Sequence, residues 1–334
     1  MGAPVFFAQR RATQGGGLLE KLEQIFDAAG FSRLISDNDL VAAKVQVGER
    51  GNTTHLRPEV VKRIVKRIRA HHGRPFVTDC GSDGARSDAV GHTLLAAEHG
   101  FAIATLGAPF VVADGLAGED AVTVPTPGRH LREAPFGAAL CQADAVIVVS
   151  HFTAAPIFGY AGALHNLGYL GLARAHRHLV THLRGLPVEA GAVSAAILDD
   201  DLPPQVAEEG LLLSCADAQE RMVEACAGFA RSKPGRCGYV TILLDVTPDP
   251  DSHPWSDAPV VPDIGVLASR DPVALDQACI DMVNSAEGIP GTRLEHAAAR
   301  DKLAELHPEV DWSNGLTYAE RLGLGTRDYE LLII

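Results

Sequence analysis

The sequence predicts an α/β protein with a mainly parallel sheet that helices cover on both faces. Short apolar runs alternate with amphipathic stretches along the first half of the 334 residues, a pattern typical of parallel strands joined by helices. Hydrophobic residues make up 46% of the chain, enough to bury a sizeable core. This length predicts one large domain or two coupled lobes, and we place the lobes at 1–150 and 151–334 with a cleft between them.

The first lobe is expected to begin with a helix and to continue with strands and helices in turn. Apolar residues at helical spacing predict a helix over 18–29 that ends at Gly30. Pro58 has the backbone angle of a first helical residue, and a stripe of Val and Ile follows it at helical spacing. Further helices are expected at 93–98 and 138–143, and strands at 40–47, 76–78, 110–113, 121–124 and 145–149.

The second lobe is expected to begin with a tight turn and a closely packed helix between 152 and 171, where Gly, Ala and aromatic residues are dense. An acidic, Pro-containing stretch at 187–205 predicts a loop or a deleted insertion, and we place a shortened insert at about 187–215. Helices are then expected at 216–231 and from Pro272, and strands at 238–244 and 264–268.

Charge and cysteine usage narrow the class of protein. The net charge of -13 argues against nucleic acid or an anionic membrane surface as the main partner, because both bind through basic patches. The six cysteines show no C-x-x-C spacing, so we expect no local zinc or iron–sulfur loop. No apolar stretch approaches a membrane span and no apolar leader follows Met1, so we expect a cytoplasmic protein with reduced thiols. The sequence is compatible with a homodimer.

The densest group of polar side chains lies in the loop 48–59, between a predicted strand and the helix that begins at Pro58. Ligands of parallel α/β sheets bind at the carboxyl ends of strands, so this loop is a candidate site. Its donors suit a carboxylate or phosphate, although simple helix capping would use the same groups. The candidates are Asn52, Thr53, Thr54, His55 and Arg57, with His55 as a general base or a ligand.

Two further strand ends carry candidate residues. Arg86 and Asp79 follow the strand at 76–78 and are candidates for an anion site, although turn chemistry explains most of this loop. His151 comes directly after the apolar strand at 145–149, and His165 and Asn166 lie in the small-residue segment that follows. Such a pair of histidines suits proton transfer or metal binding. The alternative is that the glycines serve close packing and the histidines are satisfied interior donors.

Four more histidines are candidate ligands for a divalent metal. His178 and His182 are four residues apart, a spacing that places two imidazoles on one face of a helix, with His176 nearby. A solvated face is the competing interpretation. His253 lies in the Pro- and Asp-rich loop 249–257, whose carboxylates are suited to bind a cation or to orient other histidines.

Motifs spread over nearly the whole chain resemble the iron–sulfur center proteins, a domain-of-unknown-function family of bacteria and archaea. The matching stretches are 44–59, 150–152, 159–168, 254–265, 271–277 and 309–331. Typical members carry ferredoxin-type cysteine motifs where this chain has the short segment 187–215 with one cysteine, so an iron–sulfur cluster is not expected here. The family also usually has lysine where this chain has Thr153 and His165.

The T-H-x-R-P element at 54–58 and the segment from His151 to His165 are also similar to motifs of the nickel-pincer lactate racemase. In that family the first element supplies histidine and arginine for substrate binding and proton transfer, and a lysine near the second attaches the pincer cofactor. The resemblance implies a cleft where His55, Arg57, His151 and His165 converge on a small carboxylate. Because His165 stands at the lysine position, covalent attachment of the pincer is not expected.

We therefore expect an enzyme that acts on a small, anionic, carboxylate-bearing metabolite by histidine acid–base chemistry. Arg57 and the polar residues before it would bind the carboxylate, and His55 and His151 would move protons. His165 and Asn166 would position the substrate or hold a metal. Isomerisation, elimination and cyclisation all need a base and an acid near a bound carboxylate, so all three remain open.

The alternative is a non-catalytic or redox protein that binds an iron–sulfur cluster or a metal through dispersed ligands. Cys80 and Cys141, near predicted strand ends, are the candidate thiols. A further alternative is zinc or nickel bound by His151, His165 and one histidine of the group at 176–182.

Overall fold

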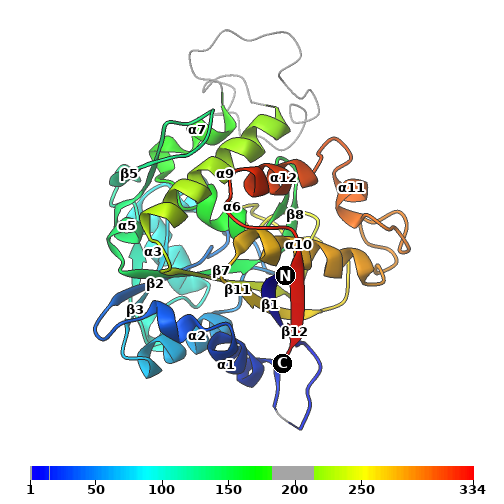
Figure 1. Ribbon diagram of the computed structural model, residues 1–334, viewed down its shortest axis with the longest axis horizontal. Helices are drawn as coiled ribbons and strands as arrows, with labels where there is room; N and C mark the ends of the chain where they lie inside the picture. The colour runs from blue at the N-terminus through cyan, green and yellow to red at the C-terminus, as the bar shows by residue number, and fades with distance from the viewer. Residues whose placement is uncertain (1, 15, 183–213) are drawn as a thin grey trace.

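An eight-stranded sheet runs through the centre of the protein (Figure 1). The structure is a computed structural model, and it describes residues 2–14, 16–182 and 214–334. The strands lie in the order β12-β1-β11-β10-β7-β2-β3-β4, and in the described sheet β11 alone runs antiparallel to its neighbours. The strands are β1 (Ala3–Gln9), β2 (Leu40–Lys44), β3 (Arg74–Asp79), β4 (Phe110–Val112), β7 (Ala145–His151), β10 (Cys237–Leu243), β11 (Gly265–Ser269) and β12 (Tyr329–Ile333). The predicted α/β fold with a mainly parallel sheet is confirmed.

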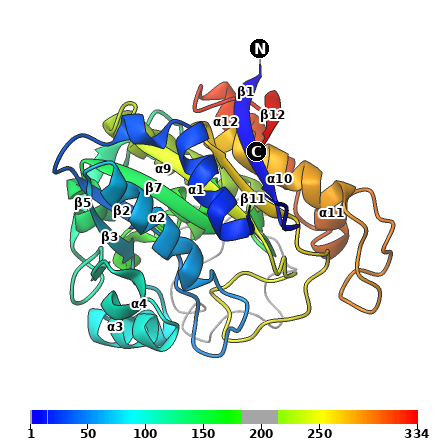
Figure 2. The ribbon, with the colours of Figure 1, turned by 90° about the horizontal axis from the view of Figure 1, so that it is seen from below.

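Helices cover both faces of this sheet (Figures 1 and 2). In β7, Val146 and Val148 belong to one buried core and Ile147 and Val149 to the other, because alternate residues of a strand point to opposite faces. A strand that is buried on both faces has the continuous apolar sequence seen here. The helices α1 (Leu18–Ala28) and α2 (Pro58–Ala70) pack on the Ile147 side, and α6 (Ala163–Gly168), α9 (Cys215–Ser232) and α10 (Pro272–Ser285) pack on the opposite side.

Shorter elements complete the described part of the chain. In this part, no helix has both the length and the apolar character that a membrane span needs. Two small sheets pair β5 (Ala121–Pro125) with β6 (Glu133–Gly137), and β8 (Thr153–Ala155) with β9 (Gly159–Ala161). The remaining helices are α3 (Ala89–Glu98), α4 (Ile103–Leu106), α5 (Ala138–Gln142), α7 (His178–Thr181), α11 (Lys302–Leu306) and α12 (Ser313–Arg321).

The segment 152–171 forms the predicted tight turn and closely packed helix. A hairpin of β8 and β9 leads into α6, which lies against α9. A Cβ atom on Gly168 would lie 2.2 Å from the carbonyl oxygen of Met222, so this crossing requires a glycine.

The division into two lobes at residue 150 is not confirmed. Strands from both halves of the chain share the eight-stranded sheet, and residue 150 lies inside β7. The short segment expected at about 187–215 lies outside the described residues, apart from its last two positions.

Candidate active site

Two loops meet at the carboxyl edge of the sheet, one after β2 and one after β10. The main-chain N–H of Glu49 donates to the carbonyl of Asp251 at 2.8 Å, and Asn52 Nδ2 donates to the carbonyl of Trp255 at 3.0 Å. Figure 2 shows the blue loop after β2 beside the yellow loop after β10. Since β2 and β10 flank β7 and run parallel to it, the two loops gather polar side chains around the end of β7.

His151 is the last residue of β7, and both of its ring nitrogens are occupied. Nδ1 lies 3.0 Å from both carboxylate oxygens of Asp251, and Nε2 lies 2.7 Å from the carbonyl oxygen of Leu244. Both partners are acceptors, so a doubly protonated imidazolium satisfies both contacts. Burial lowers the pKa of His151, but the charge and hydrogen bond of Asp251 outweigh it and leave the pKa raised. The side chains of His151 and Asp251 are 3% and 2% exposed, so this is a buried ion pair. A carboxylate of the loop 249–257 thus contacts a histidine, which is one of the two roles considered for this loop, and cation binding by the loop stays a prediction.

His55 lies half-buried in the loop after β2 and stacks on His99, the residue that follows α3. The ring centroids are 4.2 Å apart and the planes differ by 5°. Nδ1 of His55 donates to the carbonyl of Leu56 at 3.1 Å, and Nδ1 of His99 donates to the carbonyl of Val47 at 2.8 Å. A carbonyl accepts only, so each Nδ1 carries a proton, and a ring that is neutral has its lone pair on Nε2.

The environment of His55 favours its neutral form. Burial lowers the pKa of His55, and the charges of His99 and His151 lower it further, against the opposing effects of the Leu56 carbonyl and Asp251. Within the described residues, Nε2 of His55 has no hydrogen-bond partner. The side chain is therefore suited to accept a proton or to bind a ligand.

Arg57 pairs with Asp245 at the rim of the same group. Its Nη2 donates to Asp245 Oδ2, and its side chain remains 47% exposed. Asp245 lies two residues after the end of β10 and has a φ of 50°, a left-handed conformation that is uncommon for a residue other than glycine. The Asp245 charge also raises the pKa of His151, which links Arg57 to the His151 ion pair. The structure thus places His55, Arg57 and His151 at the same edge of the sheet, and the convergence predicted for them and His165 on a small carboxylate stays a prediction.

His99 and Asp245 belong to this group but were not predicted. Asp245 comes directly after the predicted strand at 238–244, so the strand-end rule that identified His151 would also have identified it. His99 had no comparable signal, because its contact with His55 joins the end of α3 to a distant loop.

The predicted substrate-binding residues at 52–54 tie the two loops together in this structure. The backbone N–H groups of Thr53 and Thr54 donate to Ser256 Oγ at 2.9 and 3.2 Å, and Asn52 Oδ1 accepts from the Thr54 N–H. Substrate binding by Asn52, Thr53 or Thr54 stays a prediction, and their observed contacts are within the protein.

A buried charge network lies beneath the loops and includes three more candidate residues, Asp79, Arg86 and Asn166. Lys44 Nζ donates to Asp79 Oδ1 at 3.0 Å, to Asn166 Oδ1 at 2.9 Å and to the Val45 carbonyl at 2.8 Å. Arg86, which is fully buried, lies 3.4 Å from carboxylate oxygens of both Asp79 and Glu49. Burial raises the pKa of Asp79, but the neighbouring cations outweigh it and hold the pKa far below its ordinary value.

Arg86 and Asn166 therefore serve the interior of the protein in this structure. Asn166 also donates through Nδ2 to the Val149 carbonyl at 3.0 Å and to Ser150 Oγ at 3.1 Å, which uses both ends of its amide. Substrate binding by either residue stays a prediction.

His165 lies on α6, apart from the group around His55. Its ring contacts Phe158 and Tyr169, with centroids 4.9 and 5.4 Å away. Burial, together with the charges of Arg177 and Lys44, lowers the pKa of His165 to about 3, so the ring is neutral. Within the described residues, no contact joins His165 to His55 or His151. A catalytic role for His165 stays a prediction.

The expectation that His178 and His182 share one face of a helix is wrong. The helix α7 ends at Thr181, and His182 has an extended backbone with φ -124° and ψ 148°. His176 lies in a preceding 3-10 turn, Arg174–His176, and the ring of His253 packs on Trp255 with centroids 4.6 Å apart. In the described ranges, no group of three or more His, Cys, Asp or Glu side chains is arranged to hold a metal ion.

The six cysteines, all of which are described, are free thiols that form no disulfide. Burial raises the pKa of Cys141 to about 11 and that of Cys80 still further, so both thiols are protonated at neutral pH. Their positions give no support to a cluster held by Cys80 and Cys141.

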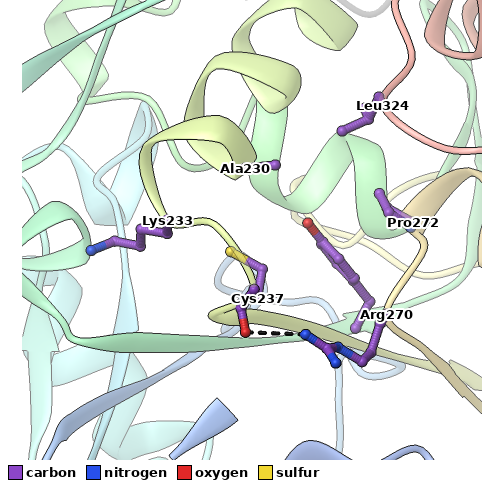
Figure 3. Close-up of a pocket in the computed structure, with 8 residues that line it drawn as sticks. Ala230, Lys233, Cys237, Arg270, Pro272 and Leu324 are labelled. Atoms are coloured by element: carbon purple, nitrogen blue, oxygen red, sulfur yellow. Dashed lines mark hydrogen bonds between the residues drawn. The ribbon is translucent and has the colours of Figure 1, made fainter. Parts of the chain in front are cut away.

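A surface pocket of about 330 Å³ opens at the other end of the sheet (Figure 3). It lies at the amino end of β10, around Cys237, whereas His151 lies at the carboxyl end of β7. Arg270 Nη2 donates to the Gly235 carbonyl at 3.1 Å across its rim, as the dashed line in Figure 3 marks. As far as the described residues show, its lining includes none of the predicted site residues.

Fold and site together define an α/β protein whose polar side chains gather at the carboxyl ends of parallel strands. The chain belongs to the family described as "Domain of unknown function (DUF362)", whose model matches residues 41–281. This confirms the resemblance to a family of unknown function. A sequence comparison with curated proteins gives no match.

Two solved structures are similar to this chain. The lactate racemase apoprotein from Thermoanaerobacterium thermosaccharolyticum matches 72% of this chain and 51% of its own, at 11% identity and a TM-score of 0.41. A protein from Thermotoga maritima matches 68% of this chain and 50% of its own, at 13% identity and a TM-score of 0.39. The chain spans about half the length of each of these structures.

Proposed function

We propose that this protein is an enzyme that moves a proton on a small carboxylate-bearing metabolite, with His55 as the base. The observation that carries the proposal is the state of His55. Its Nδ1 donates to a backbone carbonyl, its surroundings favour the neutral ring, and its Nε2 has no partner among the described residues. A positioned neutral imidazole is the commonest general base in proteins.

Arg57 is the proposed carboxylate-binding residue. Its guanidinium uses Nη2 for Asp245, which leaves further N–H donors on a half-exposed side chain near His55. Planar guanidinium donors match the geometry of a carboxylate. Because Arg57 lies only two residues after His55, both side chains leave the same loop.

His151 serves as a fixed positive charge beside the base. Its two ring nitrogens hold Asp251 and the Leu244 carbonyl, and its charge lowers the pKa of His55. Two histidines whose surroundings move their pKa values apart can hold different charges at the same pH. Direct proton transfer by His151 stays a prediction, since it would require one of these hydrogen bonds to open.

Hydrogen exchange with solvent tests the proposal whatever the product of the reaction is. Small 2-hydroxy, 2-oxo and 3-hydroxy carboxylates are incubated with the protein in D₂O. NMR follows the loss of the carbon-bound protons next to the carboxylate, or next to the keto group in the 2-oxo acids. His55→Gln is expected to slow exchange by roughly 10²–10⁴-fold, the usual contribution of a general base. Arg57→Gln is expected to raise KM.

The matched control is His72→Asn. His72 is exposed and has a φ of 62°, which asparagine tolerates, so this variant removes a histidine without touching the site. Exchange at the wild-type rate in the His55→Gln variant would contradict the proposal.

A further inference from the structure

We propose that His99 is the positioning residue of the base: its ring face fixes the plane of His55, so that Nε2 presents its lone pair to the substrate. This inference rests on the proposed role of His55 as base. It assigns a site function to a residue whose own Nε2 has no hydrogen-bond partner within the described residues.

The geometry of the pair supports this assignment. The two rings are almost parallel, 5° apart at a centroid distance of 4.2 Å, which is direct face-to-face contact. His99 is itself held from two sides, because it follows the last residue of α3 and its Nδ1 donates to the Val47 carbonyl. A ring fixed in this way restricts the orientation of the His55 ring plane. The hydrogen bond to the Leu56 carbonyl, in contrast, fixes only one atom of the His55 ring.

Gly48 shows how closely the backbone is fitted to the pair. Its φ of 83° lies in the left-handed region, and a Cβ atom there would lie 2.7 Å from His55 Cβ and 3.4 Å from His99 Nδ1. Only glycine combines this conformation with this approach. The turn therefore brings the two rings together at a place where any side chain would separate them.

The charged groups around the pair restrict which ring can carry a proton. The groups that act on His55 are the His99 ring from α3, the His151 ring from β7 and the Asp251 carboxylate from the loop after β10. Next to His99, Glu98 forms an exposed ion pair with Arg50 at 3.2 Å. Protonation of both stacked rings would place two positive charges in contact, which is unfavourable.

Two substitutions separate the ring face from the hydrogen bond of His99. His99→Phe keeps an aromatic face but loses the donor to Val47, whereas His99→Gln keeps an N–H donor but loses the face. Positioning by stacking predicts that His99→Gln disturbs His55 and that His99→Phe largely preserves it. Anchoring of the loop through the Val47 hydrogen bond predicts the opposite order.

The readout that needs no substrate is the tautomer of His55, measured by ¹⁵N NMR of the imidazole in the full chain at neutral pH. Wild type and His99→Phe are expected to show the Nδ1–H form, and His99→Gln a mixture of both tautomers. In the exchange assay His99→Gln is expected to be slower than His99→Phe by roughly 10–100-fold, the scale of a misplaced catalytic group.

An unchanged tautomer and exchange rate in His99→Gln would overturn the inference, as would equal losses in both variants. If His99→Phe does not fold by circular dichroism, His99→Tyr takes its place in the same comparison. If no substrate shows exchange in the wild type, the proposed function fails, and the tautomer measurement still decides whether His99 orients His55.

Discussion

The Nδ1 atom of His151 lies 3.0 Å from both carboxylate oxygens of Asp251, and neither side chain is more than 3% exposed. This buried ion pair fastens the loop after β10 to the end of β7. It also places a positive charge near His55, whose surroundings favour the neutral form. The pair therefore connects the fold of this edge to the chemistry proposed for it.

The first prediction concerns the pH dependence of this ion pair. Because the pKa of His151 is raised in the folded state, its stabilisation is fully present below the unfolded value of about 6.5 and is lost as pH rises through the folded value. Asp251→Asn is expected to lower the free energy of unfolding by about 3–5 kcal/mol near pH 6, the cost of breaking a buried pair. Urea unfolding between pH 6 and 9 checks this, and a cost that grows with pH would contradict it.

The second prediction concerns Gly48. Gly48→Ala is expected to destabilise the protein by about 1–3 kcal/mol or more, because it combines backbone strain with a clash against His55. Gly323→Ala is the matched control, since Gly323 has a φ of 68° with no atom within 4 Å of an added Cβ. Urea unfolding of both variants isolates the clash, and equal losses would show that none exists.

The third prediction compares two buried lysines. Lys44→Met leaves the buried Asp79 without its nearest cation, whereas Lys302 donates to the carbonyls of Asn284 and Ala299. We expect Lys44→Met to lower the free energy of unfolding by about 3–5 kcal/mol at pH 7, and Lys302→Met to lower it clearly less. Chemical unfolding gives both values.

Low pH is expected to reduce the difference in the free energy of unfolding between Lys44→Met and Lys302→Met. The pKa of Asp79 is lowered in the folded state, so its stabilisation is present above the unfolded value of about 3.8 and is lost as pH falls. The excess cost of Lys44→Met over Lys302→Met is therefore expected to shrink below pH 4. A constant excess from pH 7 to pH 3 would contradict the proposed role of Asp79.

The fourth prediction concerns Asp276, which accepts from the N–H groups of Ala163 and Leu164 at the start of α6, at 2.7 and 2.9 Å. Burial raises the pKa of Asp276 to about 7, against the opposing effect of these N–H groups. A raised acid pKa favours the folded state at low pH, so stability is expected to fall as pH rises from about 4 to 7. This slope should be absent from unfolding curves of Asp276→Asn, and an unchanged slope would assign it to another group.

The order of helices and strands could be predicted from sequence because hydrophobic periodicity and Pro58 are local features. The strands β1 and β12 could not, since they form by pairing with each other and, for β1, with β11, across most of the chain. The lobes were inferred from length, which carries no information about which strands share a sheet.

The candidate site shows the same division between local and long-range information. The strand-end rule placed His55, Arg57 and His151 correctly at one edge of the sheet. It could not show that Arg86 and Asn166 point into the interior, because that depends on partners such as Lys44. The spacing of His178 and His182 failed as a helical signal because α7 ends between them.

The charge states of His55 and His151, measured together, test the assignment of His55 as the base most directly. At pH 7, ¹⁵N NMR of the wild-type protein is expected to show His151 doubly protonated and His55 neutral, with its proton on Nδ1. A charged His55, or a neutral His55 with its proton on Nε2, would contradict its assignment as the base.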